Sequence, residues 1–126
     1  MDQHTMQSIK YANVFGLGYV SQLPTAKTGA AIRKQVPVVV ENLRLMIVAG
    51  NLSDKKYDGY SSCPLVTGYG KMVLAEFDYS KEFKPDPKLR RMGITDSSKE
   101  SWRLWVLKKH FLPRLYWNKM LKGEEF

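Results

Sequence analysis

The sequence predicts a mixed α/β fold, and three patterns along the chain support that class. An apolar run that ends in glycines, residues 11–18, leads into a long helical pattern, as in a strand–turn–helix unit. The side chains of residues 71–79 fall on two faces with a period of two, which is typical of a β-strand. Near the C-terminus, tryptophans and leucines follow helical spacing. We therefore expect a strand–turn–helix unit, a small antiparallel β element and C-terminal amphipathic helices.

The first helix is expected to begin near Pro24 and Thr25, because threonine is a favourable helix cap. Helical spacing of apolar residues then continues to the glycine at position 50. Pro37 lies inside this run and removes one backbone donor, so it should kink or split the helix. Gly50 and Asn51 are expected to end it. Backbone N–H groups at such a helix start can face a polar or anionic ligand, although this signal has low specificity.

The antiparallel element is expected around the strand at residues 71–79, with a turn at residues 68–70 before it. Residues 60–66 form either its partner strand or an extended loop, and Pro64 would place such a strand at a sheet edge. Residues 80–100 are rich in charge and proline and predict a surface connection.

The tail from residue 100 onward interleaves aromatic and basic side chains, and Pro113 is expected to break its helix. Such interleaving is typical of an amphipathic helix at a membrane interface. An ordinary docking helix with a solvated basic face fits equally well. The net charge of +8 also allows a role in solubility or nucleic-acid binding. Nucleic acid is disfavoured because the basic residues form no clean stripe and no known reader motif is present.

The composition narrows further the class of protein to which the chain can belong. The 126 residues are 44% hydrophobic and 25% charged, as in one globular domain. A single cysteine excludes an internal disulfide and favours a reducing compartment. The N-terminus lacks the features of a signal peptide, and no apolar run approaches the roughly 20 residues of a membrane-spanning helix. A position on a membrane surface stays open.

Cys63 is the residue most open to a chemical role. A buried free cysteine is the ordinary interpretation, but its setting between two serines and Pro64 is polar and constrained. No second cysteine is present for a dithiol. We expect no metal site, because His4 and His110 lie far apart and join no ligand cluster. A Cys–His–Asp hydrolase is formally possible, but no spacing supports it.

Five segments, in this order along the chain, resemble the C-terminal part of sulfide:quinone oxidoreductase, a family of flavoproteins in mitochondria and some bacteria. They are DQHTMQ, YANVFGLG, LPTAKTGAAIRKQVPVVVENL, KKYDGYSSCPLVTGYGKMVLAEFDY and LYWNKMLKG. Together they extend over nearly the whole chain. The cysteine-containing segment is the most specific of them.

The resemblance implies a partial Rossmann-type flavoprotein segment, in which the last strand is followed by the Pro-interrupted helix. Cys63 would be the second of two redox cysteines that hold sulfane sulfur beside FAD, with electrons passing on to ubiquinone. Lys27 would contact the flavin from the start of the helix, where Thr28 also lies. Gly18 and Tyr19 would occupy the place where the family has Gly-Asp, whose aspartate binds the ribityl chain of the flavin. Tyrosine at that place puts FAD affinity in question.

The resemblance also divides the chain by role. Residues 1–50 would be the C-terminal return of the FAD-binding domain, and residues 51–80 would be a β element with the redox cysteine. Residues 81–98 would be a surface linker, and residues 99–126 would be a helical tail that associates with the membrane. The family's glycine fingerprint and first redox cysteine have no counterpart here, so we expect no sulfide turnover by this chain alone. A missing N-terminal half or self-association would cover the exposed sheet edge.

The implied location is peripheral, on a bacterial cytoplasmic membrane or the mitochondrial inner membrane. The competing interpretation is a non-catalytic module that binds a membrane surface or a partner, or the remnant of a truncated gene.

Overall fold

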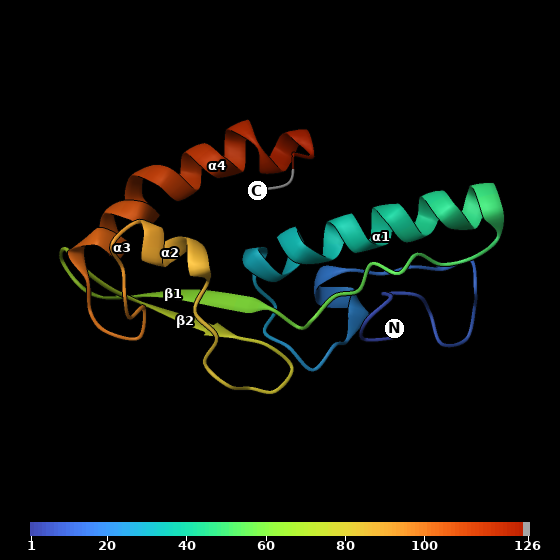
Figure 1. Ribbon diagram of the computed structural model, residues 1–126, viewed down its shortest axis with the longest axis horizontal. Helices are drawn as coiled ribbons and strands as arrows, with labels where there is room; N and C mark the ends of the chain where they lie inside the picture. The colour runs from blue at the N-terminus through green and yellow to red at the C-terminus, as the bar shows by residue number, and fades with distance from the viewer. Residues whose placement is uncertain (125–126) are drawn as a thin grey trace. The chain divides into compact units, whose positions relative to one another are not determined.

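A computed structural model describes residues 1–124 and confirms the mixed α/β class, with a two-stranded antiparallel sheet and C-terminal helices (Figure 1). The chain forms two compact units. The first unit comprises Met1–Ser61 and Asp78–Glu82, and the second comprises Ser62–Phe77 and Phe83–Phe126. The elements are η1 (Gly18–Ser21), α1 (Gly29–Ala49), β1 (Ser61–Gly68), β2 (Lys71–Phe77), α2 (Pro87–Arg91), α3 (Trp102–Val106), the π-helical η2 (Leu107–Phe111), α4 (Leu112–Asn118) and η3 (Met120–Lys122).

Helix α1 of the first unit begins later than the sequence predicts. Its cap is Thr28, whose hydroxyl oxygen accepts from the backbone N–H of Ala31 at 3.2 Å, so the predicted start at Thr25 is wrong. The helix runs without a break through Pro37, and the predicted split is wrong as well. A proline inside a helix removes one hydrogen bond, a loss that burial of one helix face can offset. The predicted end is confirmed, because the Gly50 N–H donates to the carbonyl of Met46 at 3.1 Å.

Residues 11–18 do not form the predicted strand. Within this stretch, Phe15 makes one isolated antiparallel bridge to Gln7, and η1 begins at Gly18. A buried parallel strand needs neighbouring strands to satisfy its backbone groups. The part of the chain that the structure describes places no such strand beside these residues.

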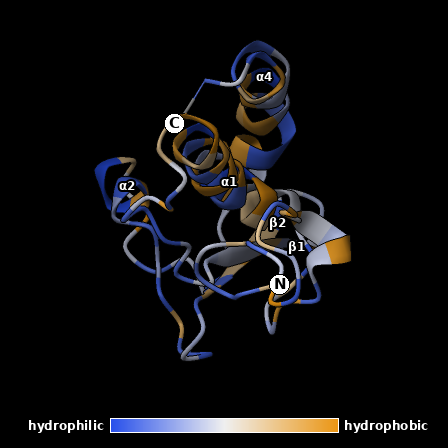
Figure 2. Cartoon of the chain, turned by 90° about the vertical axis from the view of Figure 1, so that its right-hand side faces the viewer, coloured by the Kyte–Doolittle hydropathy of each residue, from blue (hydrophilic) through white to orange (hydrophobic). Residues whose placement is uncertain are grey.

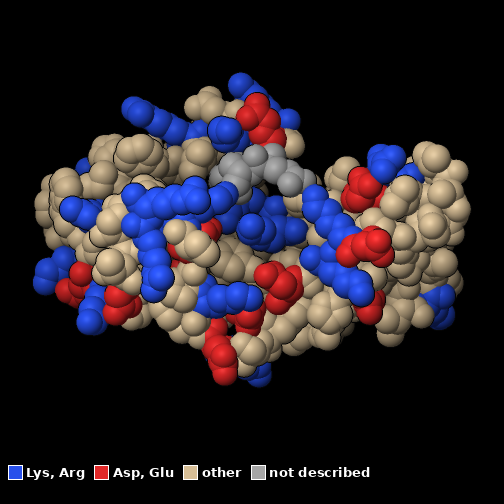
Figure 3. All heavy atoms as spheres, viewed as in Figure 1, with Lys and Arg blue, Asp and Glu red and all other residues tan. Residues whose placement is uncertain are grey.

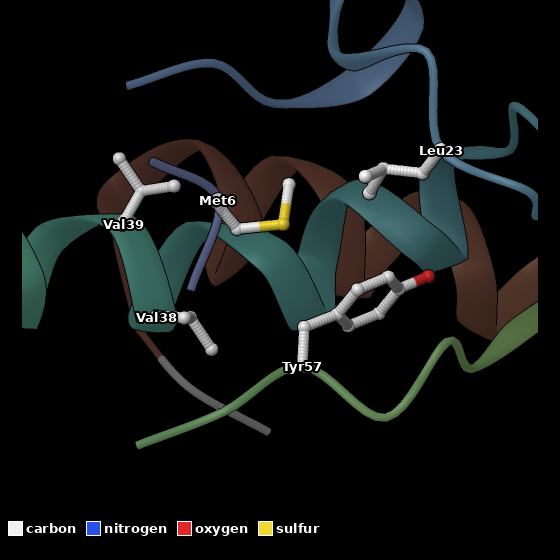
Figure 4. Close-up of a cluster of buried hydrophobic side chains, with 5 residues drawn as sticks. All are labelled: Met6, Leu23, Val38, Val39 and Tyr57. Atoms are coloured by element: carbon white, nitrogen blue, oxygen red, sulfur yellow. The ribbon is translucent and has the colours of Figure 1, made fainter. Parts of the chain in front are cut away.

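The core of the first unit gathers residues from three distant segments against α1. Its buried members are Met6, Leu23, Val38, Val39 and Tyr57 (Figure 4). Polar side chains of α1 are buried beside this core. The amide of Asn42 donates to the carbonyl of Thr5 at 2.8 Å and accepts from the Ser53 hydroxyl at 2.7 Å. Because these bonds satisfy a fully buried amide, they fix the loops on either side of α1. Figure 2 shows both hydrophobic and hydrophilic segments on α1.

The second unit is built on the β1–β2 hairpin. The alternation predicted for β2 is confirmed, since Met72, Leu74 and Glu76 are buried while Lys71 and Phe77 are exposed. The core cluster of this unit is Met72, Leu74, Leu89, Ile94 and Leu104. Two of these residues come from the stretch predicted to be a surface connection.

That stretch, residues 80–100, contains helix α2, which Asp86 caps by accepting from the N–H of Lys88 at 2.9 Å. It is tied to the strand by the buried carboxylate of Glu76. This group accepts from the backbone N–H of Asp86 at 3.2 Å and from the hydroxyl of Ser97 at 3.0 Å. The connection therefore contributes to the core as well as to the surface.

The C-terminal helices α3, η2 and α4 follow one another directly, and the predicted break at Pro113 is wrong. Pro113 is the second residue of α4, and because helical turns precede it, its missing N–H removes one hydrogen bond from a continuing helix. Just before it, the N–H of Leu112 donates to the carbonyl of Leu107, an i to i+5 bond that makes this turn π-helical. Within residues 1–124, no helix is long and apolar enough to cross a membrane. Residues 125–126 of the predicted membrane segment lie outside the described residues.

Candidate functional site

Cys63 lies on β1 with its thiol exposed, so the interpretation as a buried core cysteine is wrong. The sheet has two strands, and β1 pairs with β2 on one side. Pro64 follows the cysteine and brings no N–H to the other edge of β1, which disfavours pairing there. The Nζ atom of Lys108, from η2, donates to the carbonyl of Pro64 at 3.0 Å. A proline and a lysine thus flank the cysteine on an accessible edge strand.

The four other predicted site residues lie in the first unit, near the N-terminal end of α1, whereas Cys63 belongs to the second unit. The N–H of Gly18 donates to the side-chain oxygen of Gln35 in α1 at 2.7 Å, so this turn is fastened to the helix. The Tyr19 side chain is 84% exposed and is not packed into the core. Lys27 donates from Nζ to the carbonyl of Leu23 at 2.9 Å.

The start of α1 suits a ligand that accepts hydrogen bonds or carries negative charge. The N–H groups in the first turn of a helix have no acceptor within the helix. Thr28 satisfies one of them, that of Ala31. The partial positive charge of a helix of 21 residues and the nearby ammonium of Lys27 both favour an electron-rich or anionic group at this place.

An open pocket of about 310 Å³ in the first unit was not predicted from the sequence. Three aromatic rings meet there. The His4 ring lies 5.6 Å from the Tyr79 ring, and the Tyr57 ring lies 5.7 Å from it, both pairs edge to face. His4 Nδ1 donates to the carbonyl of Tyr57 at 3.0 Å, and the Tyr79 hydroxyl donates to the carbonyl of Gln3 at 2.5 Å. These residues are up to 76 positions apart, so no local pattern could have revealed the pocket.

The pKa values of two tyrosines in this pocket predict that the protein loses stability at high pH. Burial is the largest cause that raises the pKa of both Tyr79 and Tyr57 above the ordinary tyrosine value. Above pH ~10 the unfolded chain releases phenol protons that the folded chain still holds. The free energy of unfolding should therefore fall as the pH rises past about 10. Urea denaturation at a series of pH values measures this slope. Tyr79→Phe should flatten it, whereas Tyr69→Phe, at an exposed tyrosine of the other unit, should not. Equal slopes in the two variants would contradict this prediction.

Across residues 1–124, no group of three or more histidine, cysteine, aspartate or glutamate side chains is placed to hold a metal ion.

Comparison with known proteins shows which proteins the chain is similar to. No family model matches the sequence. It is 48% identical over 126 residues to the mitochondrial sulfide:quinone oxidoreductase of Dictyostelium discoideum, 43% identical over 123 residues to that of Mus musculus, and 47% identical over 119 residues to that of Schizosaccharomyces pombe. The chain matches the C-terminal part of sulfide:quinone oxidoreductase. The resemblance noted in the sequence is thereby confirmed.

The matches to sulfide:quinone oxidoreductase cover 100%, 98% and 94% of this chain but only 26%, 26% and 25% of the three relatives. The chain thus spans about a quarter of their length. A solved structure of similar fold is a chain in the Tetrahymena thermophila mitochondrial ATP synthase, described as an F1Fo composite tetramer model. It matches with a TM-score of 0.71 and 31% identity, over 90% of this chain and 26% of that one.

Proposed function

We propose that the chain is the C-terminal part of a sulfide:quinone oxidoreductase-type flavoprotein, in which Cys63 carries sulfur during sulfide oxidation. The observation that supports this most is the 43–48% identity to three such enzymes over almost all of the chain. The exposed position of Cys63 on β1 is consistent with it, because a thiol that receives sulfur must be accessible.

In this proposal Cys63 shares its sulfur chemistry with a second thiol from outside the 126 residues. Sulfide forms an S–S bond to one of the two cysteine sulfurs, the bond that linked them breaks, and the other sulfur leaves as a thiolate. The outer sulfur of this persulfide then bonds to the other cysteine sulfur, so that the added sulfur lies between the two cysteines. This step gives up two electrons and two protons, which a quinone accepts. The sulfur of sulfide remains as sulfane sulfur on a cysteine.

The residues of the first unit fit a flavin at the start of α1. Their contribution is the first-turn N–H groups beyond Thr28, the ammonium of Lys27 and the fastened turn at Gly18. The side chain of Tyr19 points into solvent and leaves this place open, although it does not supply a carboxylate. When bound, FAD would supply the two-electron acceptor between sulfur and quinone. The Rossmann-type arrangement and its glycine fingerprint would come from the remaining three quarters of the enzyme.

The quinone would be reached from a membrane on which the tail lies. The tail's exposed aromatic and apolar residues include Trp102, Phe111, Tyr116, Trp117 and Leu121. Residues 99–124 also hold seven basic and two acidic side chains. Such a surface suits the headgroup region of an anionic bilayer. Since the three relatives are named as mitochondrial, a peripheral position on a mitochondrial membrane is the location that we propose.

A non-catalytic, partner-binding module is the second candidate function. It is supported by the chain of 31% identity and similar fold that forms part of the Tetrahymena ATP synthase structure. In this alternative the exposed faces of the two units would contact another protein, and Cys63 would have no chemical role.

An enzyme chimera separates the two candidates. This chain would replace the matching C-terminal quarter of the Dictyostelium enzyme, and sulfide-dependent reduction of ubiquinone would be measured. We expect an active, flavin-containing chimera. A folded chimera that binds FAD but does not reduce quinone would favour the non-catalytic module. A Tyr19→Asp version serves as the matched control, because it shows whether weak flavin binding alone limits the rate.

A further inference from the structure

The tip of the β1–β2 hairpin and helix α3 share one aromatic surface in the second unit. Tyr69 lies at the tip and is 92% exposed, and its ring centroid is 5.4 Å from that of Trp105. Its neighbour Gly70 approaches Trp102 so closely that a Cβ there would lie 3.3 Å from Cδ1 of the indole. Trp102 itself is 65% exposed. We call Tyr69, Trp102 and Trp105 the hairpin aromatic patch.

Cationic side chains border this patch. The Nζ atom of Lys109 lies 4.7 Å from the ring centroid of Trp105, within the range of a cation–π interaction. Lys71 follows the hairpin tip and pairs with Glu100 at 3.3 Å. The tail that continues from α3 carries the excess of basic residues noted above. Figure 3 shows Lys and Arg side chains spread over the displayed face, with Asp and Glu side chains between them.

Aromatic rings together with cationic side chains favour a lipid bilayer as the partner of this patch. Tyrosine and tryptophan are enriched at the headgroup level of membranes, where an apolar ring meets a wet, polar layer. Lysines beside them are stabilised near the surface by the negative potential of anionic lipids. The charge of this part of the chain is complementary to such a surface. Trp105 is partly buried against the core of this unit, whereas Tyr69 and Trp102 are exposed, and large exposed rings are unfavourable in water.

We propose that the hairpin aromatic patch is a membrane anchor, which inserts Tyr69 and Trp102 into the headgroup region of an anionic phospholipid bilayer. This inference rests on the membrane role in the proposed function and extends it from the tail to the hairpin tip. Because the tip lies at the other end of the strand that carries Cys63, the sheet itself would be held at the membrane surface.

Co-sedimentation of the full chain with vesicles tests this anchor. The vesicles would contain phosphatidylcholine alone or with phosphatidylserine. We expect binding to the anionic vesicles, and a loss of affinity on the order of tenfold for Tyr69→Ser and for Trp102→Ser. Tyr69→Phe should keep most of the affinity. Tyr11→Ser, at an exposed tyrosine of the first unit, is the matched control and should bind as the unaltered chain does. Circular dichroism confirms that each variant is folded.

Two results would overturn the inference, and only the second of them would also overturn the proposed membrane role of the tail. If the unaltered chain binds anionic vesicles and all folded variants bind equally well, the hairpin aromatic patch is no anchor, and the membrane role of the tail stands. If the unaltered chain binds neither type of vesicle, the anchor and the proposed membrane role both fail.

Discussion

In the chimera described above, Cys63→Ser is expected to abolish sulfide-dependent quinone reduction, by at least about a thousandfold, or ~4 kcal/mol of transition-state stabilisation. Serine has nearly the same size as cysteine, but its oxygen does not form the S–S bond on which the sulfur transfer depends. Since the thiol is exposed and on an edge strand, the change removes no core contact. The fold and the flavin content should therefore stay as they were.

Ser62→Ala is the matched control for this prediction, because Ser62 is the preceding residue on the same strand. We expect it to keep activity within about threefold, or ~0.7 kcal/mol. Initial rates and flavin absorbance measured on both variants make the comparison. A Cys63→Ser chimera that retains its flavin and a substantial rate would exclude Cys63 from the reaction.

The second large effect is on stability. Gly59→Ala is expected to destabilise the first unit by about 2–4 kcal/mol, through a left-handed backbone conformation together with a steric clash. Gly59 has a φ of 86°, and a Cβ there would lie 2.3 Å from Cγ of Tyr79. That atom is at the base of the ring, so the whole side chain would have to move. The Tyr79 hydroxyl bond to Gln3 and the two ring contacts would be disturbed with it.

Gly50→Ala isolates the backbone part of this effect. Gly50 has a φ of 70°, and nothing lies within 4 Å of a Cβ built there. We expect a cost of about 1 kcal/mol from the conformation alone. Urea unfolding followed by circular dichroism gives both values. Equal destabilisation by the two substitutions would show that the Tyr79 ring does not restrict position 59.

The elements that local pattern determines were predictable from the sequence. The alternation in β2 follows from one buried and one less buried face, and the end of α1 follows from a glycine that leaves the helix. The prediction of helices in the tail is confirmed, although the buried residue of α3 is Leu104 and Trp102 is exposed.

Other features depended on contacts that a local pattern does not contain. Residues 11–18 are apolar enough for a strand but have no paired neighbour strand among the described residues. Pro37 and Pro113 end helices by local rules, yet the burial of Val38 and a π-helical turn before Pro113 permit the helices to continue. The burial of Leu89 in a charged stretch reflects packing on β2 rather than its own neighbours in the sequence.

The candidate site was likewise only partly predictable from the sequence. The polar setting of Cys63 weakened its interpretation as a buried core cysteine, and the structure places it on an exposed edge. The contact of Lys108 with the carbonyl of Pro64 spans 44 positions and left no trace in the sequence. The chemical roles of Cys63 and of the residues around α1 stay predictions that experiment has to test.

Peptide mass spectrometry can locate the transferred sulfur and so show whether Cys63 receives it. The chimera would be mixed with sulfide in the absence of quinone, blocked with an alkylating reagent and digested. We expect the peptide containing Cys63 to gain the mass of one additional sulfur atom, which dithiothreitol removes. If sulfide reduces the flavin while this peptide carries only the alkylated thiol with no additional sulfur, Cys63 does not carry the sulfur.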